Sequence, residues 1–326
     1  MGRLLDRLAT LELALYNANN VWHVNGDNTS GDGTKANPFE AIQEGIDAAS
    51  AKDCIIVWPQ TVPAGDTDPV SYTENLIVPV AKSNLTIFGV NGGRAQGGLP
   101  QLKVGTTTTQ ALLTVRAPGC KIENMGFNGA GATGGGILLD DDGSTKVAFG
   151  TTIENCHFKN CVGTTATNAA TGGAIQWAAT GGAWQTLIKG CRFYKNVGDV
   201  VLLGTSGSVP QDVVIEDCIF SGPAANVDCN LYLAGGSGMN GVIIRNCSFG
   251  QLPAIGSGTN VRYIIATGCV GMLEGCTFGC QTSATGGTPI TFKADGTGAL
   301  IPTTMHIVKC YGQSITASET AEISIA

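Results

Sequence analysis

The chain has 326 residues, of which 43% are hydrophobic and 13% charged, with 47 glycines and a formal net charge of −7. Many glycines with few charges are typical of an all-β chain with numerous tight turns, and unlike a helical enzyme. The negative net charge argues against nucleic acid as a partner. No apolar run in the sequence is long enough to span a membrane.

The first 20 residues predict a short helical segment that serves docking or oligomerisation. A helix this short is marginal alone, so we expect it to pack on its own chain, on sister chains or on a partner. Asp6 and Glu12 interrupt the segment and no small-residue cleavage site follows, so it does not resemble a signal peptide. We therefore expect the chain to be made in a cytoplasm. The leucines of the segment repeat at heptad-like spacings: Leu4, Leu8, Leu11 and Leu15.

A second helix is predicted from Pro38 to Ser50. It would cover the open end of a stacked-strand structure and so block edge-to-edge pairing with other chains. Its apolar face would consist of Phe39, Ile42, Ile46 and Ala49.

A six-residue unit repeats through the rest of the chain. An aliphatic residue and a mostly charged one are followed by Asn, Asp or Gly, then cysteine, a variable residue and phenylalanine. Because insertions fall between units and never inside them, each unit is expected to form the same part of one coil in a solenoid. The units begin at Ile122, Ile153, Ile188, Ile215, Ile244 and Leu273, with Met125 replacing the first cysteine and a degenerate seventh unit at Ile307.

Each position of the unit has a physical reason. Asn, Asp and Gly are the residues that best tolerate a left-handed backbone, so a sharp bend at the third position lets the apolar residues on both sides point inward. The expected core ladder consists of Cys156, Cys191, Cys218, Cys247 and Cys276 with Phe158, Phe193, Phe220, Phe249 and Phe278.

The residue before the bend alternates in charge over several units. If the coils stack in register, it forms cross-strand ion pairs, which help to fix register more than stability. These residues are Glu154, Lys189, Glu216, Arg245 and Glu274.

Further short strands are expected between the cysteine units, separated by turns rich in Gly, Thr, Ser or Asp. Parallel strands joined by crossovers wind to the right. We therefore predict an all-β, single-domain right-handed parallel β-helix over residues 21–312, preceded by the helical segment 1–20 and followed by a tail, 313–326. The additional strands begin near Gly136, Ala174, Val200, Asn230, Tyr263 and Pro289.

The beginning of this region resembles the pectate-lyase-like right-handed parallel β-helix superfamily. An opening strand at Trp22-His-Val-Asn, a glycine-rich turn and the helix that starts at Asn37-Pro-Phe-Glu-Ala-Ile-Gln follow one another as in that superfamily. The resemblance covers about residues 21–312. It implies the fold and leaves the function open, because polysaccharide lyases, hydrolases, phage tailspikes and virion decoration proteins all share it.

Candidate binding residues lie in the expected outward positions beside the cysteines. His157 and Arg192 fall on adjacent coils, with Lys159 and Tyr194 further out. They could contact an anionic sugar or a partner, and the alternative is an ordinary solvated face. Glycosidases use two carboxylates at a defined separation, and no acidic pair accompanies these residues, so we assign no catalytic residue.

Two acidic stretches could suggest a metal. Asp140, Asp141 and Asp142 could contribute to a calcium site or an acid–base pair, but such a run after a strand more often forms a turn. Gly26–Gly33 superficially resembles a calcium loop and lacks its terminal bidentate Glu. We predict turns in both places, with no metal and no cofactor.

The chain has 12 cysteines. Those of the ladder are expected to remain reduced, as small apolar core residues. Three others, Cys161, Cys229 and Cys280, fall in turns and are expected to be exposed. After release from a reducing cytoplasm they could form disulfides with neighbouring chains.

Three functions compete. We favour a non-enzymatic structural component of a bacteriophage virion: a capsid decoration protein, a minor capsid protein or a short spike. It would be a homotrimer in contact with other virion proteins, such as a major capsid protein. An extracellular type of fold without an export signal favours this function, since phage proteins leave the host by lysis. The alternatives are a polysaccharide lyase or hydrolase of the tailspike type, which needs carboxylates, and a glycan-binding adhesin, which predicts a row of exposed aromatic residues.

Overall fold

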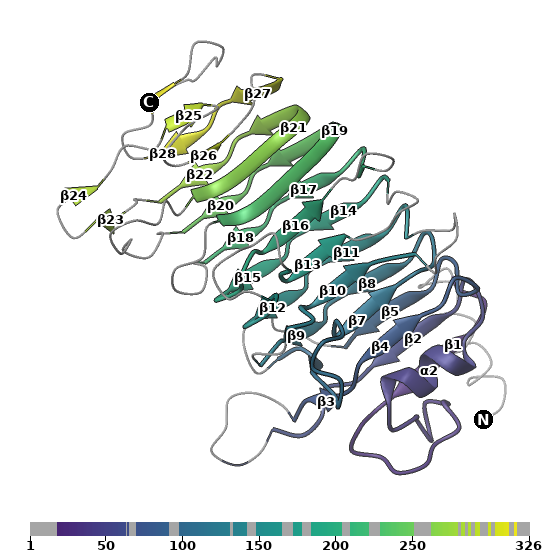
Figure 1. Cartoon of the computed structure of the whole chain (residues 1–326). Helices are drawn as coiled ribbons and strands as arrows, with labels where there is room; N and C mark the ends of the chain where they lie inside the picture. Colours follow the sequence, from purple (N-terminus) through teal and green to yellow (C-terminus); the bar gives the residue numbers. More distant parts are fainter. Residues whose placement is uncertain are drawn as a thin grey trace.

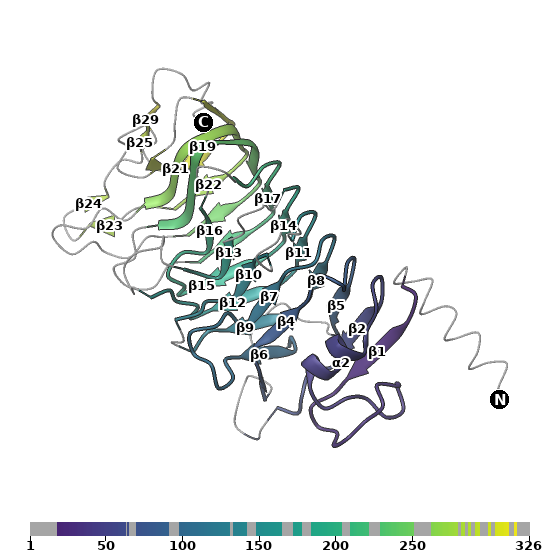
Figure 2. The same cartoon turned by 45° about the vertical axis from the view of Figure 1, so that its right-hand side comes forward.

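The computed structural model is an elongated solenoid whose strands stack along one axis, and its described residues include one short helix near the N-terminal end (Figure 1; Figure 2). Nearly all strand pairs are parallel, which confirms the predicted all-β, parallel β-helix. The residues that the structure describes are 18–62, 64, 70–90, 98–130, 133–141, 148–164, 172–177, 184–203, 209–221, 229–250, 262–279, 282–283, 286–287, 291–293, 299–300, 304–312 and 316–317. The predicted helix 1–20 falls almost entirely outside this range, as does most of the predicted tail 313–326.

Each central coil contributes three strands. The third strands of successive coils form a nine-stranded sheet. Its strands are β3 (Tyr72–Thr73), β6 (Gln101–Lys103), β9 (Gly126–Asn128), β12 (His157–Lys159), β15 (Arg192–Tyr194), β18 (Ile219–Phe220), β20 (Ser248–Phe249), β22 (Thr277–Phe278) and β28 (Tyr311–Gly312).

The other two strands of each coil belong to an 18-stranded sheet, which contains two parallel stacks. The first stack contains β4 (Leu76–Val78), β7 (Leu113–Val115), β10 (Ile137–Leu139), β13 (Ile175–Trp177) and β16 (Val200–Leu203). The second contains β1 (Val21–Val24), β2 (Cys54–Val57), β5 (Thr86–Gly89), β8 (Lys121–Glu123), β11 (Thr152–Glu154), β14 (Leu187–Lys189), β17 (Val214–Glu216) and β27 (Met305–Val308).

Two long strands, β19 (Cys229–Arg245) and β21 (Arg262–Glu274), run through both stacks and pair with each other. Towards the C-terminus, β25 (Thr291–Lys293) pairs with β26 (Ala299–Leu300) and with β29 (Thr316–Ala317). A small antiparallel pair joins β23 (Thr282–Ser283) to β24 (Gly286–Gly287).

A column of stacked phenylalanine rings fills the interior behind the nine-stranded sheet. Adjacent centroids lie 4.7–5.1 Å apart, and the ring planes are within 13° of parallel. This distance matches the spacing of neighbouring strands, about 4.8 Å, so the register of the coils sets the stacking. The column contains Phe127, Phe158, Phe193, Phe220, Phe249 and Phe278, which confirms the predicted ladder.

A file of thiols runs beside the rings. The Sγ atom of each cysteine lies 3.5–3.8 Å from the carbonyl oxygen of the aliphatic residue that opens the preceding unit. Burial, followed by a hydrogen bond with the Cys156 thiol, raises the pKa of Cys191 well above that of a free thiol. The file consists of Cys156, Cys191, Cys218, Cys247, Cys276 and Cys310, all buried and free.

The bend between the second and third strands is left-handed in every unit, as predicted. Asn124, Asn155, Asp217 and Asn246 have φ angles of 53–56°, and the glycines at the same position have φ of 61–62°. A Cβ atom at Gly190 would lie 2.6 Å from the side-chain oxygen of Asn155. The glycines in this file therefore leave room for the amide side chains of the preceding coil, Asn155 before Gly190 and Asn246 before Gly275.

A second left-handed file precedes the strands of the second stack, and sequence reasoning did not find it. The backbone N–H of each member from Lys52 to Asp212 donates to a carbonyl of the next coil along the axis. Its residue types are too varied to form a recognisable motif. The members are Lys52, Asn84, Gly119, Gly150, Gln185, Asp212 and Gly241.

The predicted ladder of ion pairs is present in part. Glu216 accepts from Lys189, with Nζ and Oε1 3.0 Å apart, and from Arg245 on its other side. Hydrogen bonds from Lys189 and then Arg245 lower the pKa of the Glu216 carboxyl. Glu154, which faces Lys189 across the strands, instead pairs with Lys121 at 3.1 Å.

The capping helix is α2 (Ile42–Ala48), shorter than the predicted Pro38–Ser50. It begins late because Phe39 forms a β-bridge with Val24, which keeps the preceding residues extended. The Glu44 carboxylate accepts from the N–H groups of Glu40 and Ala41 at 3.2 Å and so caps the first turn. Ile42 and Ile46 are fully buried, as the predicted apolar face requires.

The phenylalanine column predicts unequal effects for two adjacent residues. Replacing Phe220 with alanine should lower the free energy of unfolding by about 3–5 kcal/mol, because a fully buried ring leaves a cavity between two others. Replacing Ile219, which is 38% exposed, should change it by at most about 0.5 kcal/mol. Urea unfolding of both variants measures the difference, and equal effects would show that the ring column does not carry stability.

Candidate functional site

The outward face of the nine-stranded sheet carries the four predicted binding residues. Register pairs His157 with Arg192 and Lys159 with Tyr194, so the structure brings them together on the adjacent strands β12 and β15. Their positions follow from the ring column: Phe158 and Phe193 point inward, so the residues on either side must point outward.

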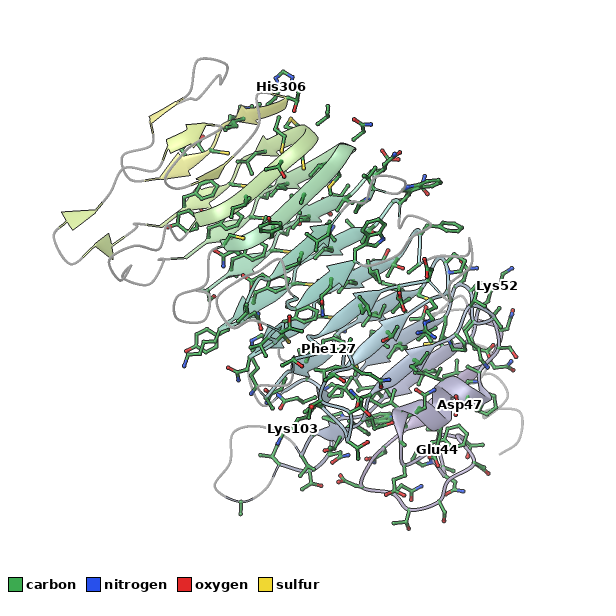
Figure 3. All side chains as sticks on the ribbon, viewed as in Figure 1. Glu44, Asp47, Lys52, Lys103, Phe127 and His306 are labelled. Atoms are coloured by element: carbon green, nitrogen blue, oxygen red, sulfur yellow. The ribbon has the colours of Figure 1, made fainter. Side chains whose placement is uncertain are left out.

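Arg192 and Tyr194 are exposed, and the next residue, Lys195, places its Nζ atom 5.1 Å from the centroid of the Tyr194 ring. Such a cation–π contact holds the ammonium group over the ring face. Lys103 on β6 lies on the same sheet, towards the N-terminal end of the column, and His306 lies at the opposite end (Figure 3). We call Lys103, His157, Arg192, Tyr194 and Lys195 the basic strip.

Lys159 does not join the basic strip as an accessible cation. We predicted it on the outward face, and its strand position is outward, but only 7% of its surface is exposed. Its neighbours in the same column are Asn128 and Tyr194, and long side chains on adjacent strands cover one another. Lys159 is therefore largely covered and does not present its ammonium group on the surface of the basic strip.

None of the nine strands of this sheet, as the structure describes them, contains an aspartate or glutamate. Three glutamates of the central coils instead lie on the second stack, where Glu123, Glu154 and Glu216 accept from cations. A chain of net charge −7 thus has one face with locally positive charge. Guanidinium, ammonium, imidazole and phenol groups supply hydrogen-bond donors for carboxylate, sulfate or phosphate oxygens.

The glycine-rich stretch forms turns and bends, as predicted, whereas the described part of the other acidic stretch does not, because Asp141 forms a β-bridge. Asp140 makes an ion pair with Arg116, with Oδ2 and Nε 3.2 Å apart, and Asp142 lies outside the described residues. In the glycine-rich turn, Asp27 accepts from the N–H and hydroxyl of Thr61, and Asp32 accepts from those of Thr34. Hydrogen bonding from Thr34 lowers the pKa of Asp32.

The prediction of exposed cross-linking cysteines is wrong for two of the three. Cys161 and Cys229 are both fully buried, and burial raises the pKa of Cys161 to about 12. A protonated, inaccessible thiol does not exchange with disulfides. Cys229 begins strand β19 instead of lying in a turn, and both side chains pack in buried hydrophobic clusters, which a sequence pattern alone does not reveal. Cys280 lies outside the described residues.

A pocket of about 210 Å³ lies beside the cap and was not foreseen. Glu40, Glu44, Tyr72 and Glu74 are among the residues that line it. The carboxylate of Glu74 accepts from the N–H groups of Ile42 and Gln43, at 2.9 and 3.0 Å, so it ties the start of α2 to the following coil. Burial raises the pKa of Glu74 despite these bonds. No motif around Glu74 indicates that its side chain reaches the helix.

A buried carboxyl group lies behind the basic strip. Asp199 is fully buried and accepts from the amide groups of Asn196 and Asn230, at 2.9 and 2.7 Å. Asn196 also accepts from the N–H of Cys161 and donates to the carbonyl oxygen of Phe158. The three side chains therefore join three successive coils. Burial raises the pKa of Asp199 to about 7.

Within the described residues, no group of three or more His, Cys, Asp or Glu side chains is placed to hold a metal ion. No described helix has the length and apolar character needed to cross a membrane.

No protein-family model matches the chain, and no curated protein matches its sequence. Solved structures match it in fold. A lacto-N-biosidase from Eubacterium ramulus superposes with a TM-score of 0.50 at 9% identity, over 94% of this chain and 68% of that one. A surface adhesin of Streptococcus pneumoniae gives 0.48 at 11% identity, over 87% and 72% of the two chains. A pectate lyase from Xanthomonas campestris gives 0.46 at 16% identity, over 90% and 83%. The likeness is one of fold, the right-handed parallel β-helix.

Asp199 predicts a pH-dependent stability. Its pKa of about 7 in the folded chain exceeds the ordinary value of about 3.9, so folding favours the protonated form. The stability that this group contributes is fully present below about pH 4 and is lost as pH rises through about 7. Three pKa units at about 1.4 kcal/mol each allow a loss of up to about 4 kcal/mol.

The Asp199→Asn variant should therefore gain stability over the parent chain as pH rises from 4 to 8, measured by urea unfolding at each pH. Asp217→Asn is the matched control, because it changes an exposed carboxyl and keeps a residue that suits the left-handed backbone. A constant difference between Asp199→Asn and the parent chain across this range would contradict the prediction.

Proposed function

We propose that the chain is a non-enzymatic structural component of a bacteriophage virion, a capsid decoration protein, minor capsid protein or short spike. In this proposal it acts as a homotrimer in contact with other virion proteins, such as a major capsid protein. The observation that carries the proposal is the axial core, in which identical rings and reduced thiols continue from coil to coil.

The thiols support assembly in a reducing compartment. Eleven cysteines in the described part of the chain are free and buried. While a chain is unfolded in an oxidising compartment, its thiols are accessible and can pair wrongly. A chain with this many unpaired cysteines therefore suits synthesis and folding in a host cytoplasm. Once folded, the thiols are protected by burial, and eight of them also by a raised pKa, so release by lysis would leave them reduced.

The geometry of the core supports a mechanical role. Each coil contacts its neighbours through backbone hydrogen bonds on three sides and through side chains of the same type inside. Such a solenoid transmits load along its axis and offers long outward faces to partners. Both properties suit a protein that stabilises or decorates a particle.

A second candidate function is the binding of an acidic glycan, and the basic strip favours it. Lys103 lies at one end of the basic strip and Arg192 with the adjacent Lys195 at the other, and the nine described strands of this sheet contain no carboxylate. A linear polyanion lying along the solenoid axis would contact both groups, with His157 between them. The alternative of a polysaccharide lyase or hydrolase would use the same face, with catalytic groups added to the binding groups.

The virion proposal predicts that antibodies against the recombinant chain label purified particles of the phage that encodes it. Mass spectrometry of gradient-purified particles should find the chain at a fixed ratio to the major capsid protein. In sedimentation experiments the recombinant chain should have the mass of three chains. Absence of the chain from purified particles would refute the virion assignment, and a monomer in solution would refute the trimer alone.

The oxidation state of the ladder cysteines can be measured separately. Alkylation of the chain taken from particles should leave the ladder cysteines unmodified until a denaturant is added, and then modify them without a reductant. Disulfides among Cys156, Cys191 or Cys218 would contradict folding in a reducing compartment.

The glycan candidate predicts that polygalacturonate or alginate retards the chain in native affinity electrophoresis. The Arg192→Gln variant should bind about fivefold more weakly, since one exposed charge contributes about 1 kcal/mol. Lys309→Asn is the control, because it removes one exposed charge at the far end and suits the left-handed backbone there. Equal losses in the two variants would indicate a general charge effect and remove the strip as the site. Release of unsaturated or reducing ends would show that the chain is an enzyme.

A further inference from the structure

Two large aromatic side chains are exposed on neighbouring coils, away from the basic strip. Phe149 is 44% exposed and Trp184 is 48% exposed. They immediately precede the second left-handed file, in the turns that lead into β11 and β14. Sequence reasoning found no row of exposed aromatic residues, because 35 positions separate the two and no common motif surrounds them.

The backbone fixes these two residues in one line. The N–H of Gly119 donates to the carbonyl oxygen of Phe149 at 2.8 Å, and the N–H of Gly150 donates to that of Trp184 at 2.7 Å. The same bond recurs on the neighbouring coils, so the line continues along the axis in both directions. The full line is Ser83, Pro118, Phe149, Trp184, Gln211 and Asn240.

The residues that follow each member of this line belong to the second left-handed file. Gln185 and Asp212 are exposed there, beside Trp184 and Gln211. We define the aromatic ridge as Phe149 and Trp184 together with the polar side chains next to them, which are Gln185, Gln211, Asp212 and Asn240.

We propose that the aromatic ridge binds a neutral oligosaccharide whose chain runs parallel to the solenoid axis. A pyranose ring presents C–H groups on its faces, which pack on aromatic rings, and hydroxyl groups around its edge, which need donors and acceptors. Phe149 and Trp184 supply the rings. The amides of Gln185, Gln211 and Asn240 each supply both a donor and an acceptor.

The spacing of the coils suits such a ligand. Successive coils are separated by about 4.8 Å, which is close to the length of one pyranose unit in an extended chain. Consecutive sugars can therefore lie over consecutive coils, two on the aromatic rings and the next ones beside the amides. The left-handed turns hold the backbone rigidly, so little conformational entropy is lost when the ligand binds.

The charge of the aromatic ridge points to a neutral ligand. None of the residues of the line or of the adjoining file, from Pro118 to Gly241, is a lysine or arginine. The single charged side chain is Asp212, which would repel uronates, sulfates and phosphates. The ridge therefore differs in specificity from the basic strip, where cations predominate and carboxylates are absent from the described strands.

The proposal is tested with the full chain in native affinity electrophoresis, on gels that contain dextran, glucomannan, galactan or soluble starch. At least one of these neutral polysaccharides should retard the parent chain. Trp184→Ala and Phe149→Ala should each raise the dissociation constant about tenfold or more, as expected for an exposed aromatic anchor. Arg192→Gln should leave the retardation by neutral polysaccharide unchanged.

Tyr311→Ala is the matched control, because Tyr311 is 44% exposed but lies on the nine-stranded sheet. It should bind as the parent chain does, and circular dichroism and urea unfolding should show that all variants are folded. The proposal is overturned if no neutral polysaccharide retards the chain or if Tyr311→Ala loses as much binding as Trp184→Ala. It is also overturned if Trp184→Ala alters only the oligomeric mass, since the ridge would then be a contact between chains.

Discussion

The left-handed bend between the second and third strands of each unit determines the rest of the structure. It needs a residue that accepts positive φ, and Asn, Asp or Gly occupies that position in every unit except the degenerate last one, where Lys309 adopts the same conformation. Because the bend takes a single residue, the aliphatic side chain before it and the cysteine after it both face inward. The phenylalanine two positions later must then face inward as well. One conformational requirement thus sets the side-chain direction of five residues.

Because this bend recurs in every unit, it sets the register in which all the coils stack. A slip of one residue would turn the ring column outward, so successive units can stack in only one way. Stacking in that register produces near-parallel rings at 4.7–5.1 Å and puts each thiol next to a carbonyl group of the previous coil. The ion pairs around Glu216 follow from the same register and need no separate explanation. The thiols remain reduced because the register also buries them.

The repeat could be recognised in the sequence because each of its positions requires a particular type of residue. Asn246, Cys247 and Phe249 each satisfy a different constraint, so they recur together and the ladders could be predicted. Gln185 and Lys52 adopt the same left-handed conformation without being typical of it, and the file that contains them was not predicted. The burial of Cys161 and the bonds of Glu74 to α2 depend on contacts between segments that are distant in the sequence. Such contacts join residues with no common pattern, and only the structure gives them.

The contrast between recurring and non-recurring residues also separates the interior of this protein from its outer surface. Inward positions repeat because every coil must fill the same space, and they therefore say little about function. Outward positions do not have to fill that space, so no packing requirement dictates their residue types. A local cluster of basic or aromatic side chains at outward positions therefore needs another cause. Arg192 beside Tyr194, on a sheet without described carboxylates, is one such departure, and Trp184 beside Phe149 is the other. They lie on different faces and have opposite charge character. A rigid core of this kind can present both surfaces at once, since a ligand on one face does not require the other to move.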